Sequence, residues 1–192
     1  MKKLFIISIL MFSVLMTSNA QFTKVGGGLA LTSGFQFHQQ TWPANKSGII
    51  GLYFNGIYEL SVPFHIAPSF SIFYPHITKD QLTTTKVSSM MFDLNGHYVF
   101  NSLDKFEFYG LAGFNALIAG KKDKIEGSAT FKESDNALGL NLGVGTYMKI
   151  TEQFDLNAEV KYVFNNKYNQ FMLNAGILLN LDWMKKHENT QM

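Results

Sequence analysis

Alternation of apolar and polar residues at every second position is the feature of this sequence that most restricts its fold. In residues 138–150, LGLNLGVGTYMKI, one parity is almost entirely apolar, whereas the other holds glycines, an asparagine, a tyrosine and a lysine. A β-strand directs successive side chains to opposite faces, so this segment predicts a strand with one apolar face. Eight segments follow this pattern, at residues 23–34, 48–60, 64–77, 86–100, 104–120, 136–150, 154–165 and 168–182.

The first 20 residues have the pattern of a secretory signal peptide. Lys2 and Lys3 precede an apolar stretch at residues 4–15, and small residues leading to Ala20 form a cleavage site. A membrane-spanning helix needs ~20 apolar residues, so the apolar stretch is too short to be one. We therefore expect export, cleavage after Ala20, and a mature chain with 14 basic and 14 acidic residues.

The composition of the mature chain excludes several classes of protein. A chain without net charge gives no reason to expect a nucleic-acid partner. The absence of cysteine excludes disulfides, a lipoprotein anchor and thiol chemistry. No apolar run after the signal reaches the ~20 residues of a spanning helix, so the exported chain either stays soluble or enters a membrane as strands.

The direction of the apolar face separates these two possibilities, because a soluble β-sandwich or lipocalin also alternates but keeps its apolar face inside. Here no charged residue lies mid-strand on the apolar parity, and large aromatics such as Tyr74, Phe100 and Phe154 gather towards its ends. Such aromatics are typical of the two girdles of a transmembrane barrel. We therefore predict an all-β, eight-stranded antiparallel up-and-down barrel at residues 21–182, with its apolar face towards lipid and a short periplasmic tail at 183–192.

Turn lengths indicate how this barrel is oriented. Short turns follow residues 60, 100 and 150, whereas longer polar stretches occur at 36–47, 78–85 and 121–135. Outer-membrane barrels have short periplasmic turns and longer external loops, so both termini are expected in the periplasm. We interpret the lysine-rich run at 121–124 as a solvated loop tip, with a lipopolysaccharide-binding patch as the alternative.

An eight-stranded barrel is only wide enough for side chains to fill its interior, and buried charges without partners are costly. We therefore expect a polar, paired filling. Three-residue turns would set a register in which acidic and basic residues face one another at the periplasmic mouth. The four predicted inward pairs are Glu59 with His65, His97 with Glu107, Lys149 with Asp155, and Lys24 with Asp182.

Further polar residues share the inward parity. The same register places Gly145 opposite Glu159 and Gly143 opposite Lys161, so the glycines would leave room for the long side chains. We interpret Asp93 and His97, on one strand face, as interior packing, and the glycines at 26–28 as allowing close strand approach. The other interior polar residues are Asn141, Asn157 and Asn174.

The last predicted strand also carries an assembly signal. Asn174, Gly176, Leu179 and Leu181 resemble the C-terminal pattern that the outer-membrane insertion machinery reads, although no terminal phenylalanine follows. The mature chain as a whole resembles the small outer-membrane β-barrel proteins known in Bacteroidota as the porin family. Their architecture is similar to that of OmpX and of the OmpA membrane domain. The resemblance implies the fold and an outer-membrane location, and implies little about activity.

We expect a structural or surface-interaction protein that is not an enzyme and has no cofactor or metal. Its expected partners are outer-membrane lipid, lipopolysaccharide and the insertion machinery, and we expect a monomer. The first alternative is a narrow pore or a partner in a secretion or assembly complex. A lipid A-modifying enzyme, with His76 acting on Ser69 or Ser71, ranks below it, because nothing in the sequence brings nucleophile and base together.

Overall fold

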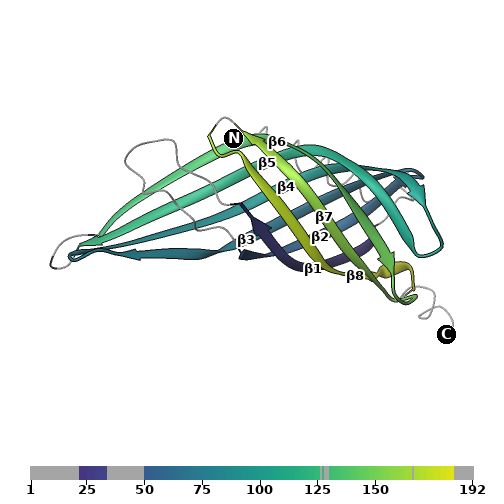
Figure 1. The fold of residues 1–192 in the computed structure, drawn as a ribbon, viewed down its shortest axis with the longest axis horizontal. Helices are drawn as coiled ribbons and strands as arrows, with labels where there is room; N and C mark the ends of the chain where they lie inside the picture. The colour runs from purple at the N-terminus through teal and green to yellow at the C-terminus, as the bar shows by residue number, and fades with distance from the viewer. Residues whose placement is uncertain (1–21, 34–49, 126, 128–129, 166, 184–192) are drawn as a thin grey trace, which may run out of the picture.

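Eight antiparallel strands close into one barrel, in which each strand pairs with its sequence neighbour and β1 pairs with β8 (Figure 1). The computed structural model describes residues 22–33, 50–125, 127, 130–165 and 167–183. The predicted eight-stranded up-and-down barrel is confirmed. The strands are β1 (Phe22–Thr32), β2 (Ile50–Ser61), β3 (Phe64–Lys79), β4 (Thr83–Ser102), β5 (Phe106–Ile125), β6 (Thr130–Lys149), β7 (Phe154–Asn165) and β8 (Gln170–Asn180).

The predicted signal peptide at 1–20 and the tail from residue 184 onward lie outside the described residues. A single helical turn at residues 181–183 follows β8. Within the described ranges, no helix has the length and apolar character needed to cross a membrane.

Strands β3 to β6 continue well beyond the other four strands and form two long hairpins at one end of the molecule, on the left in Figure 1. The sequence predicted polar loops at 78–85 and 121–135, and this prediction is wrong for most of both stretches. The ladder continues there because β-branched threonines favour strands and because opposite charges pair across it, as in Lys121 opposite Glu133. We call this end the hairpin end and the opposite end, where β1 begins and β8 stops, the terminal end.

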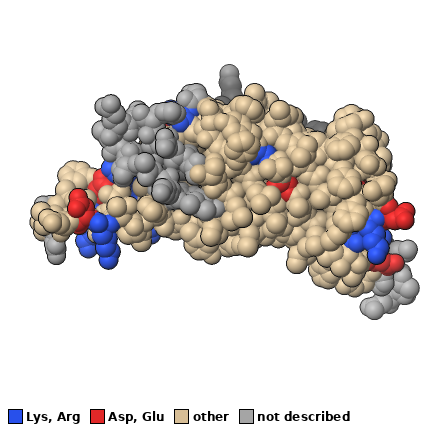
Figure 2. Space-filling view, viewed as in Figure 1, with Lys and Arg blue, Asp and Glu red and all other residues tan. Residues whose placement is uncertain are grey.

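The outside of the barrel is apolar over its middle. On β6 the outward residues from Leu138 to Met148 carry no charge, and Leu138 is 78% exposed. On β5 the same holds from Phe106 to Ile118. Figure 2 shows that most acidic and basic side chains in view lie at the two ends of the molecule. This outward apolar surface, which we call the apolar band, confirms the predicted direction of the two faces.

The closure between β1 and β8 depends on glycine. A side chain at Gly26 would place its Cβ 2.0 Å from the carbonyl oxygen of Ile177, and one at Gly28 would lie 2.1 Å from that of Ala175. Real atoms do not approach so closely, so only glycine allows β1 to approach β8 in this way. The sequence-based interpretation of the glycines at 26–28 is confirmed for this pair of strands.

Candidate functional site

A charged cluster lies in the middle of the barrel interior. Lys161 on β7 places its Nζ 2.8 Å from Asp93 Oδ2 on β4 and 3.1 Å from Glu159 Oε1, and both Lys161 and Asp93 have side chains that are 0% exposed. The Nδ2 groups of Asn115 and Asn141 donate to Asp93 Oδ1 at 2.6 and 3.0 Å. These contacts supply the partners that buried charges require. We call Asp93, Glu159 and Lys161 the charged belt.

Glu159 joins this belt to its surroundings. Asn174 on β8 donates to Glu159 Oε1 at 3.2 Å, and the hydroxyl of Tyr109 donates to Oε2 at 3.4 Å. His97 Nε2 lies 3.9 Å from the same Oε2, beyond hydrogen-bond distance. The belt contains two carboxylates and one ammonium group, so its stability depends on these neutral donors as well as on Lys161.

Three aromatic rings stack beside the charged belt. The rings of His97 and Tyr109 are 4.2 Å apart and nearly parallel, and Tyr109 and Tyr147 are 4.5 Å apart. His97 Nδ1 and the Tyr147 hydroxyl are hydrogen-bonded at 2.6 Å. The Tyr53 hydroxyl donates to Asn157 Oδ1 at 2.6 Å, and Asn157 donates to Tyr109 at 2.8 Å. These contacts join side chains from five strands, β2, β4, β5, β6 and β7, and fix them relative to one another.

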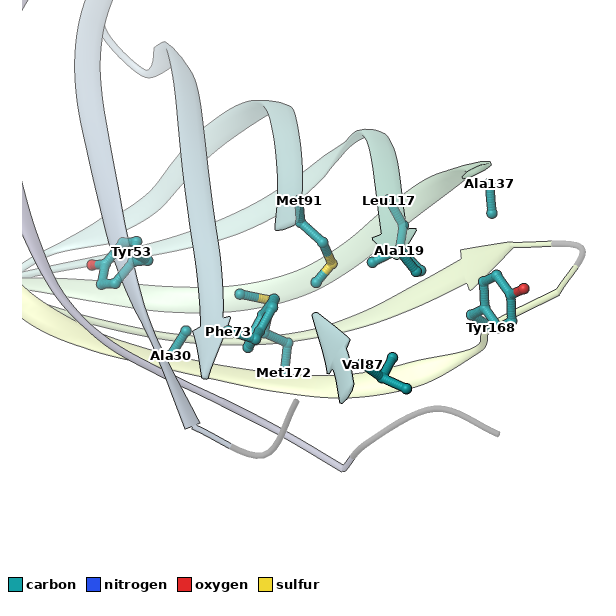
Figure 3. Packing of buried hydrophobic residues seen from close by; sticks show 10 residues of the cluster. All are labelled: Ala30, Tyr53, Phe73, Val87, Met91, Leu117, Ala119, Ala137, Tyr168 and Met172. Atoms are coloured by element: carbon teal, nitrogen blue, oxygen red, sulfur yellow. The ribbon is translucent and has the colours of Figure 1, made fainter. Parts of the chain in front are cut away.

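Apolar layers lie on both sides of the charged belt. Towards the hairpin end, Met91 and Met172 pack around Phe73 (Figure 3). Towards the terminal end, Ile57, Leu111 and Leu178 form a second cluster. The predicted polar filling is therefore only part of the interior, because inward positions on both sides of the belt also carry apolar residues.

Two of the four predicted inward pairs have the predicted register. Glu59 lies opposite His65, with 3.9 Å between His65 Nε2 and Glu59 Oε1, and Lys149 lies opposite Asp155. The carboxylate of Asp155, however, binds Lys24 Nζ at 2.7 Å, so Lys149 does not take it as predicted.

The other two predicted pairs are wrong. Lys24 is committed to Asp155 rather than to Asp182, which follows β8 in the helical turn. His97 lies opposite Leu111, not Glu107, because β4 continues to Ser102 and contains a bulge. Instead of a ring of four pairs, the terminal end holds a cavity of about 290 Å³, which we call the mouth cavity. Its lining includes Lys24, Glu59, Glu107, Lys149, Asp155 and Asp182.

The interior glycines have the predicted register but not entirely the predicted role. Gly143 lies opposite Lys161, and a Cβ there would lie 2.2 Å from the Val160 carbonyl oxygen. Gly145 lies opposite Glu159, but its empty space is filled by the ring of Tyr109, whose Cζ would lie 2.4 Å from an added Cβ. Gly145 therefore makes room for an aromatic ring from β5 rather than for Glu159.

The remaining predicted polar residues lie inside as expected. Asn141, Asn157 and Asn174 are each 1–2% exposed. In the predicted insertion signal, Asn174 points inward and Gly176 packs against Gly27 on β1, where an added Cβ would lie 2.5 Å from the carbonyl oxygen. Leu179 is on the outward parity and Leu181 lies in the helical turn. The role of these residues as an assembly signal stays a prediction.

His76 and the two serines considered as nucleophiles, Ser69 and Ser71, are spread along β3. Ser71 and His76 are five residues apart on β3, roughly 16 Å along an extended strand, and Ser69 donates to Asp93 at 3.4 Å. Neither serine is placed for attack through His76. Among the described residues, no three His, Asp or Glu side chains are grouped as a metal site would require.

Sequence reasoning missed the central role of Asp93. Alternation places Asp93 on the inward parity, but its partner Lys161 lies 68 residues away on a strand that is not adjacent. Alternation alone carries no signal for contacts across the barrel lumen, so the charged belt could not be assembled from hairpin registers.

Comparison with known proteins gives a family and a fold. The family model described as "Outer membrane protein beta-barrel domain" matches residues 4–184. No curated protein matches the sequence.

Solved barrels of bacterial outer membranes have similar structures. Ail, the attachment invasion locus protein of Yersinia pestis, has a TM-score of 0.56 at 16% identity, covering 83% of this chain and 99% of its own. Neisserial surface protein A has a TM-score of 0.58 at 16% identity, with coverages of 85% and 99%. A major outer membrane protein of Thermus thermophilus has a TM-score of 0.61 at 12% identity, with coverages of 84% and 99%. At these identities the likeness concerns the fold.

Proposed function

The chain belongs to the outer membrane protein beta-barrel domain family. We propose that it is a closed, non-catalytic barrel that acts through its surface. It is an integral protein of the bacterial outer membrane, and the apolar band is the surface that its strands present to lipid. In the proposed orientation the terminal end faces the periplasm and the hairpin end faces outward.

One observation carries the proposal of a closed barrel. The charged belt lies between two apolar layers, the side chains of Lys161 and Asp93 are 0% exposed, and Lys161 Nζ is held by two carboxylates at 2.8 and 3.1 Å. An ion moving through this interior would have to displace paired buried charges and pass both apolar layers. Such displacement is costly in a low-dielectric interior, so the described interior favours a plug over a conduit.

The proposal extends to partners. The apolar band would contact outer-membrane lipid, and the hairpin end would contact lipopolysaccharide. The insertion machinery would act during assembly, and the barrel would function as a monomer without cofactor or nucleic acid. None of these contacts requires a catalytic group, and the separation of Ser71 from His76 supports a role without catalysis.

Conductance of the refolded protein in planar lipid bilayers tests the closed barrel. We expect no steady single-channel openings, whereas the variant Tyr109→Ala with Tyr147→Ala, which removes two stacked interior rings, should conduct more than the unmodified chain. Steady openings of the unmodified protein would instead support the alternative of a narrow pore.

Catalysis is tested on the same preparation. Incubation with lipopolysaccharide, followed by mass spectrometry of lipid A, should leave every acyl chain in place. Loss of an acyl chain that depends on His76 would overturn the non-catalytic proposal and favour a lipid A-modifying enzyme.

A further inference from the structure

Three lysines from adjacent strands lie side by side on the outer surface near the hairpin end. Lys86 on β4 lies opposite Lys122 on β5, and Lys122 lies opposite Lys132 on β6. All three side chains are exposed and share the outward parity of their strands. Neighbouring strands are about 4.8 Å apart, so the three Cα atoms lie within roughly 10 Å. We call these three residues the lysine row.

The lysine row lies just beyond the apolar band. From the lysine row towards the middle of the barrel, the next row of outward-facing residues is Ser88, Gly120 and Ser134. The row after it includes Met90 and Ile118, which belong to the apolar band. Lys86 and Met90 are four positions apart, about 13 Å along the strand and roughly 10 Å in height at the usual tilt. Lysine side chains bend towards a membrane interface, so the three ammonium groups reach the level of the lipid headgroups.

A hollow lies in front of the row. Its volume is about 530 Å³, and its lining includes the three lysines, Ser88, Gly120 and Ser134. Lys121 and Glu133, which lie opposite one another on the inward parity of β5 and β6, complete the lining. An added Cβ at Gly120 would meet only Ser88 Oγ, at 3.6 Å, so packing does not require glycine there. Small residues therefore leave open space beneath the ammonium groups, with two hydroxyls as further hydrogen-bond donors.

At the described strand positions around the row, no acidic residue lies on its own face. Like charges directly opposite one another destabilise a sheet, and none of the three lysines has an acidic partner within 4 Å among the described residues. Of the described acids at the hairpin end, Asp123, Glu133 and Asp135 lie on the inward parity, and Asp80 lies in the turn between β3 and β4. Asp123 binds Lys121 at 2.8 Å, and Asp135 binds Lys167 at 2.6 Å.

We propose that the lysine row binds the phosphates of a phosphorylated glycolipid of the outer leaflet, lipopolysaccharide, whose acyl chains lie on the apolar band below. The row supplies three positive charges at headgroup level, the hollow supplies room, and the adjoining apolar band supplies the surface for the chains. Each lysine near an anionic lipid surface adds roughly a factor of five in affinity. The proposal rests on the proposed function only for the outward orientation of the hairpin end.

The variant Lys122→Gln with Lys132→Gln tests the proposal, because both side chains are exposed and uninvolved in the fold's ion pairs. The matched control is Lys105→Gln with Lys149→Gln at the mouth cavity, which removes the same charge from the terminal end. Binding of lipopolysaccharide to each purified, folded barrel in detergent micelles would be measured by native mass spectrometry. The same lipopolysaccharide without its lipid A phosphates, phosphatidylglycerol and inorganic phosphate serve as the other probes.

We expect the row variant to bind phosphorylated lipopolysaccharide about 20-fold more weakly and the control variant to bind within about twofold of the unmodified chain. Lys122→Arg with Lys132→Arg should restore binding, which distinguishes lost charge from altered folding. The proposal would be overturned if the row variant bound phosphorylated lipopolysaccharide as tightly as the unmodified chain does. It would also be overturned if the unmodified chain bound the dephosphorylated lipid, phosphatidylglycerol or inorganic phosphate as tightly as phosphorylated lipopolysaccharide. None of these results bears on conductance, so the closed barrel stands or fails separately.

Discussion

Lys161 Nζ lies 2.8 Å from Asp93 Oδ2 at the centre of the barrel, and neither side chain is reached by solvent. The pair joins β4 to β7 directly across the lumen, where the backbone ladder makes no connection between them. Because Glu159 shares the same ammonium group, one lysine compensates two buried carboxylates. Loss of the positive charge of Lys161 would therefore leave both carboxylates without their counter-charge.

Replacement of Lys161 by methionine should strongly destabilise the barrel. The substitution keeps much of the side-chain volume but leaves Asp93 and Glu159 buried without a counter-charge, which costs about 3–5 kcal/mol. The measurement is the free energy of unfolding in urea after refolding into lipid vesicles. The exposed Lys149 gives the matched control, and its replacement by methionine should change stability by less than about 0.5 kcal/mol.

A second substitution identifies the cause. Adding Asp93→Asn to Lys161→Met removes one of the two uncompensated carboxylates, so the double variant should be more stable than Lys161→Met alone. Equal or lower stability of the double variant would show that lost packing, not unpaired charge, explains the effect.

The sequence predicted which side of each strand faces lipid better than it predicted the side-chain contacts inside the barrel. Alternation indicates which side of each strand faces lipid, and short turns set the registers of Glu59 with His65 and of Lys149 with Asp155 correctly. The predicted register of His97 is wrong for two reasons: the turn between β4 and β5 begins later than the polar residues suggest, and β4 contains a bulge. No local sequence pattern reveals either feature.

Contacts that cross the lumen or involve both neighbouring strands were out of reach. Gly145 lies between Tyr109 on β5 and Glu159 on β7, and the register of the β6–β7 hairpin predicts only the contact with Glu159. Lys24 extends past β8 to Asp155 on β7, a choice made by side-chain direction rather than by hairpin register. Length and bending of a side chain decide such contacts, and alternation contains no information about either.

Replacement of Gly145 by alanine should disrupt the aromatic stack. An added Cβ would lie 2.4 Å from the Tyr109 ring, which is also stacked between His97 and Tyr147, so the ring cannot move without breaking its contacts. Overpacking of this kind costs about 1–3 kcal/mol. The free energy of unfolding and the near-ultraviolet circular dichroism of the tyrosines report it.

Gly110 on β5 supplies the control for this substitution. A Cβ there meets nothing within 4 Å, so Gly110→Ala should be neutral or slightly stabilising. If both alanine variants lost the same stability, the effect would belong to strand glycines in general and not to the Tyr109 ring.

Replacement of Gly28 by alanine should impair closure of the barrel. The added Cβ would lie 2.1 Å from the Ala175 carbonyl oxygen, and backbone atoms of the paired strand cannot yield as a flexible side chain does. We expect a lower refolding yield, measured as the fraction of protein that migrates as the compact form on unheated gels. Gly96→Ala, where an added Cβ would meet only the Ala112 carbonyl oxygen at 3.7 Å, should refold normally.

Acid should weaken the hairpin end through Asp135, which lies beyond the apolar band. Desolvation by burial would raise the pKa of this carboxyl, but hydrogen bonds from Lys167 and Tyr168 outweigh it and hold the pKa below its ordinary value. A depressed pKa in the folded state stabilises the fold above the unfolded pKa of about 4, and this contribution disappears as the pH falls through the folded pKa. The difference in unfolding free energy between the unmodified chain and Asp135→Asn should therefore be constant from pH 7 to about pH 5 and shrink towards pH 2. A carbon-13 titration of the Asp135 carboxyl with a midpoint at or above the ordinary value, or a difference that grows in acid, would contradict this account.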